Sequence, residues 1–488
     1  MRTTSWFGGL VRRGHDAVPV PIGARMLHLD GVPATSEQTT TPVPVPLLWS
    51  VGSVPTRAVS HRGRTLAVFG VCEVSDSELR EVLDDGLTDA LVREWAGCYT
   101  VVEVAPTRTT ILTDPAGAQP VYVAEVSAGL AWGSSSRALA PLTGYRLDLG
   151  WLERLLVRPP LHDALLGGSA FAGVRLMPPG ARIELAPGRP PVTRTAWSPS
   201  VPPTVPALAG RGESTERAAD KVFAGVERLR AALSSGVRVR AETTDRITAD
   251  CSGGLDSTAV CLLAGPERVI AINVQPPHVD ATEPSGDLAY VREVDAAYPL
   301  LHRRRVVVSD PQLPYAAMDA LPPTDEPPRS VVVSARFAHV SQILRELGST
   351  LHLTGDGADA LLTPPLGYLR TLPPVRAWRH LRGWAILRGT SPWRLMRDLP
   401  TEDPIAAVVG AVRLAARPAA SDLQLAESHG LRYASPFFDN QVVDAVTSVP
   451  VAAYASPSAY KPLLAKAFAD LLPRPVAERG TKATFLPD

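Results

Sequence analysis

Residues 249–260 read ADCSGGLDSTAV, and this stretch decides how the second half of the chain folds. The residues before its glycines, 246–251, are short and partly β-branched, which predicts a buried strand. The residues after them, 258–264, predict a helix packed on a sheet. A strand, a Gly-Gly turn and a helix in succession point free backbone N–H groups toward an anion. Taken alone, the stretch also fits an ordinary turn with an Asp or Ser helix cap.

The loop inside this stretch, residues 252–257, contains no lysine. The pattern G-x-x-x-x-G-K-[ST] of P-loop kinases is therefore absent. Two adjacent glycines, Gly253 and Gly254, let the backbone approach an oxyanion closely, and serine hydroxyls add donors. Because a carboxylate would repel phosphates, we expect Asp256 to bind Mg²⁺ between them.

A second acidic glycine loop occurs in LTGDGADALL, residues 353–362. It too ends a predicted strand and begins a helix, with Asp356 and Asp359 three residues apart. If both loops lie at the carboxyl edge of one sheet, Asp359 can share a metal ion with Asp256. Two complementary loops favour a phosphate and metal site over a pair of ordinary turns.

Strands and helices alternate through the second half, with strands predicted at 268–275, at 304–310 and within 349–362. This alternation predicts a parallel, doubly wound sheet with ligands at the carboxyl ends of its strands. Short β-rich segments in the first half predict a mixed α/β layer domain. The predicted organisation is a first domain at 1–190, a Pro-rich linker at 191–214 and a second domain at 215–488.

The composition excludes several classes of protein. The 488 residues carry no formal net charge, which gives no electrostatic basis for bulk binding to nucleic acid or membrane. The four cysteines form no C-x-x-C pair, and no run of about 18 apolar residues predicts a membrane span. We therefore expect a cytoplasmic protein. Only four of the 49 basic residues are lysines, so each deserves separate consideration: Lys221, Lys461, Lys466 and Lys482.

SGGLDS at 252–257 resembles the pyrophosphate-binding PP-loop of N-type ATP pyrophosphatases. With the motifs that follow it in order, the second half resembles asparagine-synthetase-type ligases; these motifs are GDGAD (355–359), SPFFDNQVVDAVTSVP (435–450), YKPLLAKAFADLLP (460–473) and RGTK (479–482). Three segments of the first half resemble the glutaminase domain of such synthetases, namely TDPAGAQPVYV (113–123), AWGSSSRAL (131–139) and VRLMPPG (174–180). The resemblance implies an α/β protein, with an N-terminal glutaminase-like (Ntn-type) α/β sandwich and a C-terminal doubly wound parallel-sheet ATP pyrophosphatase (PP-loop) domain.

The resemblance implies ATP-dependent amide formation, in which a carboxylate is adenylated and an amine displaces AMP. The residues that would hold pyrophosphate by this resemblance are Ser252, Gly253, Gly254, Leu255, Asp256 and Ser257. Asp256 and Asp359 would bind Mg²⁺, and Val274 and Gly355 would contact the nucleotide. The candidate catalytic residues are Lys482, which matches the lysine before a mobile glycine-rich loop, with Lys461 and Asp356.

Departures from the family pattern concern the source of the amine. Glutamine-dependent members need a cysteine at the mature N-terminus, whose own α-amine acts as base. This chain begins Met1-Arg2-Thr3-Thr4-Ser5, and its first cysteine is Cys72. We therefore expect a glutaminase-like first domain without glutaminase activity, and an amine that comes with the substrate.

Two branches of the family form intramolecular amides, the β-lactam synthetases and the lasso peptide cyclases. β-Lactam synthetases have a tyrosine at the middle of the acidic loop, where this chain has Asp356, so the sequence favours a cyclase. In a cyclase the α-amine of the peptide attacks an adenylated Asp or Glu side chain. An α-amine has a pKa of about 8, so part of it is neutral near pH 7 without a strong base.

The expected partners are a precursor core peptide, a leader peptidase and a leader-recognition protein, with no nucleic acid. Two alternatives remain open at this stage. One is a small-molecule amide ligase of the β-lactam or asparagine synthetase type, and the other is a non-catalytic peptide-binding scaffold. One further departure is that the chain stops at ATFLPD (483–488), where the family continues through its glycine-rich loop.

Overall fold

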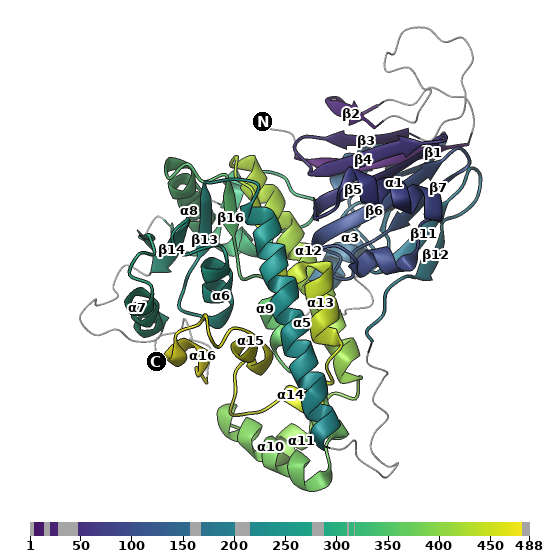
Figure 1. Ribbon diagram of the computed structural model, residues 1–488. Helices are drawn as coiled ribbons and strands as arrows, with labels where there is room; N and C mark the ends of the chain where they lie inside the picture. Colours follow the sequence, from purple (N-terminus) through teal and green to yellow (C-terminus); the bar gives the residue numbers. More distant parts are fainter. Residues whose placement is uncertain are drawn as a thin grey trace, which may run out of the picture. The chain divides into compact units, whose positions relative to one another are not determined.

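The computed structural model describes residues 4–13, 20–27, 47–156, 167–200, 215–275, 287–309, 312–316 and 318–480. It forms two compact units, neither of them continuous in sequence (Figure 1). The first comprises Met1–Ser198, Ala317–Ser334 and Arg413–Gly430, and the second Pro199–Ala316, Ala335–Val412 and Leu431–Asp488. These units differ from the continuous ranges predicted above, because two segments from the second half of the chain pack with the first unit.

The first unit contains two six-stranded sheets whose neighbouring strands are all antiparallel. One sheet has the order β10 (Val174–Leu176), β8 (Tyr122–Val126), β9 (Gly129–Gly133), β1 (Trp6–Arg12), β3 (Leu47–Val51), β2 (Ala24–Met26). The other has the order β12 (Val192–Thr195), β11 (Ala181–Leu185), β7 (Arg108–Leu112), β6 (Gly97–Ala105), β5 (Arg64–Cys72), β4 (Thr56–His61).

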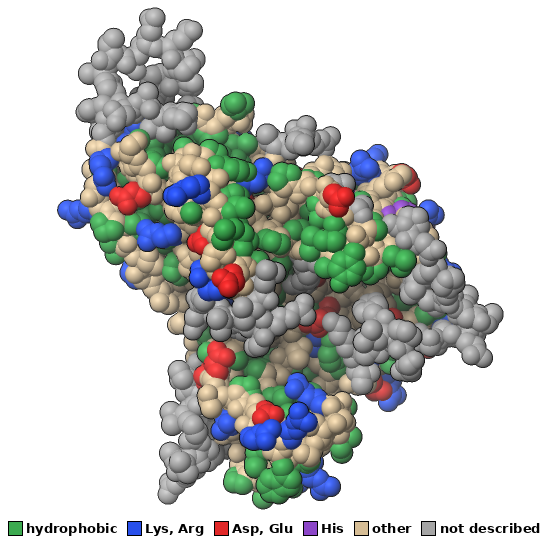
Figure 2. Space-filling model, turned by 180° about the vertical axis from the view of Figure 1, so that it is seen from behind, with side chains coloured by type: hydrophobic (Ala, Val, Ile, Leu, Met, Phe, Trp, Pro, Cys, Tyr) green, Lys and Arg blue, Asp and Glu red, His purple; other side chains and the backbone are tan. Residues whose placement is uncertain are grey.

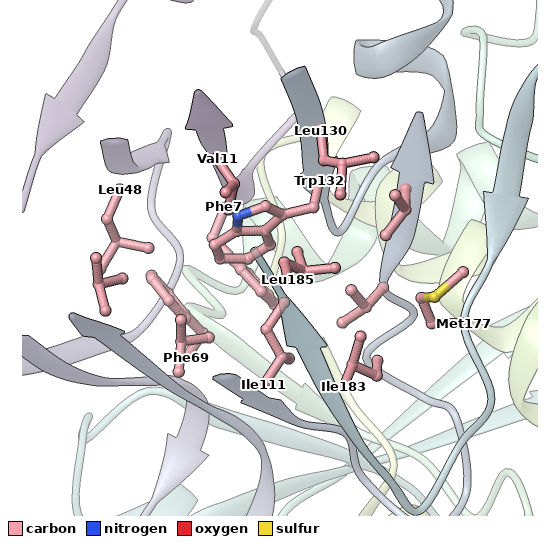
Figure 3. Close-up of a cluster of buried hydrophobic side chains, with 14 of the residues drawn as sticks. Phe7, Val11, Leu48, Phe69, Ile111, Leu130, Trp132, Met177, Ile183 and Leu185 are labelled. Carbon is pink, nitrogen blue, oxygen red and sulfur yellow. The ribbon is translucent and has the colours of Figure 1, made fainter. Parts of the chain in front are cut away.

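Buried apolar side chains from both sheets form one core (Figure 3). Phe7 on β1 stacks on Phe69 on β5, with ring centroids 4.2 Å apart. Trp132 on β9 lies edge-on to Phe7, at a centroid distance of 6.4 Å. The two sheets are therefore packed face to face, as in a sandwich.

Helices cover the outer faces of this sandwich. Helix α1 (Asp76–Asp85) packs on β4 and β5 of the second sheet. The outer face of the first sheet shares a separate core with α2 (Ser136–Leu139) and α3 (Leu149–Leu156), in which Trp151 is fully buried. The resulting order of layers, helix, sheet, sheet and helix, confirms the predicted glutaminase-like α/β sandwich.

Buried polar contacts hold the two late segments in the first unit. The guanidinium of Arg417, on α12 (Pro404–Ser428), donates to the Glu326 carboxylate, with Nε 3.0 Å from Oε2. The hydroxyl of Tyr122 donates to the same carboxylate at 3.3 Å. The neighbouring Asp325 accepts a hydrogen bond of 2.7 Å from the Ser135 hydroxyl. Residues almost 300 positions apart thus complete one network in the first unit.

The second unit contains a five-stranded sheet whose neighbouring strands are all parallel. Its order is β15 (Arg303–Val307), β14 (Val269–Gln275), β13 (Ile247–Asp250), β16 (Leu351–Leu353), β17 (Tyr433–Ala434). Strands added after β13 extend the sheet first in one direction and then, from β16 on, in the other. The switch point lies between β13 and β16, and loops that leave the carboxyl ends of these two strands meet there. The predicted doubly wound parallel sheet is confirmed.

Helices α5 (Thr215–Ala241) and α13 (Asn440–Thr447) are joined by a buried ion pair. The Arg240 guanidinium donates to both carboxylate oxygens of Asp439, at 2.6 and 2.7 Å. Gly236 lies one turn earlier, and a Cβ there would lie 2.2 Å from Asp439 Oδ2. Glycine at 236 is therefore what allows the carboxylate to lie against α5.

Two further observations concern the sequence predictions. Within the predicted Pro-rich linker, Val192–Thr195 form edge strand β12, because this short β-branched segment pairs with β11. Across the parts of the chain that the structure describes, no helix is both long and apolar enough to span a membrane.

Candidate functional site

The loop after β13 has the form expected of an anion site. Strand β13 ends at Asp250, and α6 (Leu255–Leu263) begins four residues after Cys251. Between them Gly253 has a φ of +87°, and a Cβ there would lie 2.6 Å from the carbonyl oxygen of Asp287. Only glycine fits this turn, which leads directly into the N-terminus of a helix.

Two serine hydroxyls lie inside the same loop. Oγ of Ser252 and Oγ of Ser257 are 3.0 Å apart, and the backbone N–H of Ser252 donates to the Ser257 hydroxyl at 3.2 Å. Both therefore stand beside the first turn of α6, where backbone N–H groups lack partners within the helix. This combination of hydroxyls and helix N–H groups suits a phosphate oxygen.

The acidic loop after β16 packs directly on the first loop. A Cβ at Gly355 would lie 3.0 Å from both Cβ of Asp256 and the backbone nitrogen of Ser257. Gly357 has a φ of +88° and lies against the ring of Phe438. This left-handed glycine leads the chain into α9 (Ala358–Leu362). The two glycine loops predicted from the sequence are thus neighbours at the switch point of the sheet.

Lys461 joins the carboxylates of the two loops. Its Nζ contacts Asp256 and lies 2.6 Å from Oδ1 of Asp359. The lysine side chain is fully buried, whereas the side chains of Asp256 and Asp359 are 20% and 51% exposed. Lys461 has a φ of +46° and caps α15 (Pro462–Ala467), so a left-handed backbone directs the ammonium group to this position. One buried cation therefore serves two carboxylates that open to solvent.

Tyr460 lies beside this cluster. Its hydroxyl donates to Oδ1 of Asp359 at 3.0 Å. Burial raises the pKa of Tyr460, and the negative charges of Asp359 and Asp256 raise it further. The phenol consequently stays protonated and acts as a hydrogen-bond donor in the cluster.

Arg479 supports the first loop from another side. Its guanidinium lies 2.6 Å from Oδ1 of Asp287 and donates a hydrogen bond of 3.3 Å to the carbonyl oxygen of Gly253. The guanidinium carbon also lies over the ring of Tyr290, 4.4 Å from the ring centroid. Asp287 is the first residue of α7 (Asp287–Ala297). Because Arg479 is buried, this cation fixes the loop between α7 and the end of the described chain.

These elements surround an open cleft of about 200 Å³. It is lined by Ser252, Gly254, Leu255, Asp256, Ser257, Asp287, Gly355, Asp356, Asp359, Tyr460 and Arg479. Eight of the residues predicted from the sequence are in this set. Gly253 faces α7 instead, and Val274 lies half-buried on β14, outside the lining. Lys482 lies outside the described residues.

Three lining residues were not predicted from the sequence. Tyr460 and Arg479 stand inside motifs quoted above, directly before Lys461 and three residues before Lys482. Their places in these motifs could have marked them as candidates. The contact of Tyr460 with Asp359 and that of Arg479 with Gly253 could not be inferred from the sequence. Asp287 is the first residue of α7 and gave no signal, since its role depends on the way α7 packs against the loop.

The carboxylates of this cleft suit a magnesium ion that takes most of its ligands from water and phosphate. Among the described residues, no three or more His, Cys, Asp or Glu side chains gather in a way that could hold a metal ion. Asp256 and Asp359, however, converge on the ammonium of Lys461, and both line the cleft. Mg²⁺ commonly takes one or two protein carboxylates and completes its shell with water and phosphate oxygens. The two aspartates fit that requirement.

Comparison with known families identifies the second half of the chain. The family model described as asparagine synthase matches residues 228–425 and 419–488, which together span more than half of the chain. No curated protein matches this chain.

Solved structures give distant likenesses. The NH3-dependent NAD synthetase from Campylobacter jejuni, in complex with the nitrate ion, is 14% identical, with 39% of this chain and 93% of that one covered and a TM-score of 0.21. The glutamine phosphoribosylpyrophosphate amidotransferase from B. subtilis, complexed with ADP and GMP, is 12% identical, with 75% and 78% covered and a TM-score of 0.21. With TM-scores this low, neither likeness carries weight for activity.

Proposed function

This chain belongs to the asparagine synthase family, and from this premise we propose that it closes a macrolactam ring in a ribosomally made peptide, as lasso peptide cyclases do. ATP-dependent amide formation is the activity at the level of the family. One observation carries the proposal to this chain. The anion loop, the two aspartates and the buried Lys461 meet in a single open cleft at the switch point of a parallel sheet.

The proposed reaction has two steps. A carboxylate oxygen of an Asp or Glu side chain in the peptide attacks the α-phosphorus of ATP, and the bond from this phosphorus to the bridging oxygen of pyrophosphate breaks. The products are an acyl-adenylate and pyrophosphate. The α-amine of the same peptide then attacks the acyl carbon, AMP leaves, and the new amide nitrogen releases one proton. The net change in the peptide is the loss of one water molecule.

The chain's own residues act by binding and by charge. The N–H groups at the start of α6 and the hydroxyls of Ser252 and Ser257 bind the oxygens of pyrophosphate. Lys461 supplies a fixed ammonium beside Asp256 and Asp359, where negative charge develops on the departing group. Tyr460 keeps the Asp359 carboxylate oriented through its hydrogen bond. Asp256 and Asp359 would hold Mg²⁺, which when bound supplies positive charge to the triphosphate.

The α-amine of the peptide is the proposed nucleophile. The first unit contains two cysteines, Cys72 at the end of β5 and Cys98 in β6. A cysteine inside a strand has no free α-amino group of its own, and such a group is the base that a glutaminase of this type uses. This supports an amine that arrives on the substrate. Because a folded peptide holds its amine beside its own adenylate, proximity replaces much of the chemistry of a separate ammonia site.

Asp356 is the residue that favours a cyclase over a β-lactam synthetase. It lines the cleft between Gly355 and Asp359, at the position where β-lactam synthetases have tyrosine. We propose that its carboxylate faces the attacking amine and takes up the proton that the amide nitrogen releases. A small-molecule amide ligase of the asparagine synthetase type is the second candidate. A non-catalytic scaffold is disfavoured, since such a protein would not require the intact loop at 252–257 together with Asp359.

We propose a cytoplasmic location, because ATP is available there and the four cysteines are free thiols. A leader peptidase and a leader-recognition protein are the proposed partners, since a peptide must expose its α-amine before it can cyclise. Both proposals depend on the peptide being the substrate.

The decisive experiment supplies the full chain with ATP, Mg²⁺ and a leader-free peptide that has an N-terminal glycine and an acidic residue in its first ten positions. We expect AMP and pyrophosphate in equal amounts, and a peptide lighter by one water molecule. Two matched peptides separate the steps. An N-acetylated peptide should be adenylated without cyclisation, detected as a hydroxamate after addition of hydroxylamine. A peptide with Asn or Gln at the acidic position should release no AMP.

Three results would contradict the proposal. Release of ADP in place of AMP would exclude adenylation. Cyclisation only with added ammonia or glutamine would indicate an intermolecular amide ligase. Turnover of free aspartate but of no peptide would assign the chain to the small-molecule branch.

A further inference from the structure

A second charged region lies outside the cleft, in residues 370–397. This segment contains seven arginines and no acidic residue, and the first carboxylate after it is Asp398. The whole chain carries no net charge, so positive charge is concentrated here rather than spread over the protein. Such a concentration requires an explanation that the cleft does not give.

The segment folds into two helices, α10 (Pro374–Leu387) and α11 (Pro392–Arg397), which pack on each other at the end of the second unit away from its sheet (Figure 1). Large apolar side chains on both helices remain exposed. Val375, Ile386 and Trp393 are 77%, 78% and 66% exposed, respectively. Trp378 and Trp393 lie together with ring centroids 5.0 Å apart, which joins the two helices into one surface.

The arginines on this surface are also exposed. Arg379, Arg382, Arg388 and Arg394 all point their side chains to solvent, and among the described residues no ion pair joins any of them to a carboxylate. The pKa of the neighbouring His380 is lowered, first by burial and then by the charges of Arg376 and Arg379. Of the seven arginines, Arg397 pairs with Asp398 at 3.1 Å, and these four keep their positive charge unpaired by any described carboxylate. Figure 2 shows basic and apolar side chains gathered together over this end of the unit.

A groove runs beside the exposed helices. It has a volume of about 460 Å³ and joins the end of α10 to α11. Its walls are apolar at Leu366 and Leu395, and its charged groups are two cations, Arg388 and Arg394, and one carboxylate, Asp398. The Thr390 hydroxyl adds a donor. Two guanidinium groups and a hydroxyl over an apolar floor suit a phosphate group that is attached to hydrocarbon.

We propose that α10 and α11 form a docking surface for an anionic lipid bilayer. Exposed Trp, Ile and Val side chains interleaved with arginines are typical of helices that lie in the interface of a membrane. The apolar side chains enter the boundary of the acyl chains, while the long arginine side chains reach the phosphate groups. Nucleic acid would pair with the arginines and tryptophans but leaves Val375 and Ile386 unused. An acidic protein would require a carboxylate for each arginine and is the competing occupant that the experiment distinguishes.

This inference goes beyond the proposed function and does not depend on it. Attachment would be peripheral, because no helix in the described parts of the chain can span a membrane. The protein would add to its catalytic cleft a second, separate site that places it at a charged membrane surface.

The test is co-sedimentation of the full chain with vesicles. One set contains phosphatidylcholine alone, and the other an equal mixture of phosphatidylcholine and phosphatidylglycerol. We expect binding to the anionic vesicles only, with an affinity that falls as salt is added. The variant R379E/R382E should lose at least about tenfold in vesicle affinity, because each arginine near an anionic surface contributes on the order of 1 kcal/mol. The variant I386S/W393S should also bind more weakly and should lose the Trp fluorescence change on binding.

The matched control is R304E/R305E. These two exposed arginines belong to the other basic cluster of the second unit, on β15, and their replacement should leave vesicle binding unchanged. Equal loss in this control would overturn the assignment to α10 and α11. Absence of binding to anionic vesicles would overturn the proposal itself. Retention by immobilised polyglutamate without vesicle binding would assign the surface to an acidic protein instead.

Discussion

Two carboxylate–cation clusters in the second unit are built from the same chemistry but differ in their access to water. In the Arg240–Asp439 pair both side chains are at most 4% exposed, and both carboxylate oxygens accept hydrogen bonds from the guanidinium. In the cleft, Lys461 is equally buried, yet Asp256 and Asp359 are 20% and 51% exposed. Both partners of the first cluster are shielded from water, so we call it the closed pair. In the second cluster only the cation is shielded.

This difference distinguishes a structural ion pair from a site. A buried pair whose partners satisfy one another cannot bind anything else without first breaking. A buried ammonium facing partly exposed carboxylates keeps a fixed positive charge and two carboxylate groups at the edge of a cleft. Solvent access on one side, and not the number of charges, therefore marks the functional cluster.

Replacement of the buried cation should have the largest effect. Lys461→Met removes the ammonium that faces the departing pyrophosphate and leaves two carboxylates to repel the phosphates. We expect the rate of AMP formation to fall about 10³-fold. The control is Lys466→Met on the same helix, an exposed lysine that should leave the rate unchanged. An unaffected rate in the Lys461 variant would show that the cleft cluster is as structural as the closed pair.

The closed pair should affect stability and not chemistry. Asp439→Asn leaves the Arg240 charge buried without a counter-charge, so we expect about 3 kcal/mol less stability in urea unfolding. AMP formation per folded molecule should stay the same. Asp470→Asn provides the contrast, because its partner Arg230 and Asp470 itself are 41% and 66% exposed. That exposed pair should contribute less than about 1 kcal/mol, and a larger value would weaken the distinction drawn from burial.

Asp359→Asn tests the open side of the cleft cluster. We expect AMP formation to fall about a hundredfold and the Mg²⁺ concentration needed for half of the maximal rate to rise, because one oxygen ligand loses its charge. Since Asp359 is half-exposed, the midpoint of urea unfolding should not move. A magnesium titration at fixed ATP measures the first effect. An unchanged titration would remove Asp359 from the proposed metal site.

An exposed charge gives the smallest expected effect. At the start of α1, the hydroxyl and backbone N–H of Ser75 both donate to the Glu78 carboxylate, and these hydrogen bonds lower the pKa of Glu78. A lowered folded pKa contributes stability above the usual glutamate range near 4.3, which is lost as the pH falls through the folded value. Ser75→Ala should therefore cost about 1 kcal/mol at neutral pH and less in acid. When Glu78 is first replaced by Gln, the stability lost through Ser75→Ala should be the same at neutral and at acidic pH.

Sequence reasoning predicted most of the second unit because the relevant signals are local. The alternation of β-branched strands with helices predicts a parallel sheet, and each glycine loop can be recognised from about ten consecutive residues. Their meeting at the switch point also followed, since the carboxyl ends of parallel strands share one edge. Strand β17 was not predicted, because Tyr433–Ala434 is too short for any periodicity to appear.

The contacts of the cleft could not be predicted in the same way. Lys461 was a candidate because of lysine scarcity and a matched motif, but its reach to both aspartates depends on a left-handed backbone at φ +46°. Nothing in the sequence marks a non-glycine residue for that conformation. The contact between Arg479 and Gly253 likewise joins residues more than 200 positions apart, and only the folded chain brings them together.

The discontinuity of the first unit has a consequence for biosynthesis. Most of its sandwich is formed from residues before Ser198, but Glu326 and Arg417 complete its buried network, and Arg417 leaves the ribosome almost 300 residues after Tyr122. Until then, Tyr122 and Ser135 lack their acidic partners, and the outer surface of the first sheet lacks a side chain from α12. Domains of a nascent chain generally fold in order of synthesis. Here the earlier half must wait for the later one, so a fragment that ends near residue 190 would expose a surface prone to aggregation.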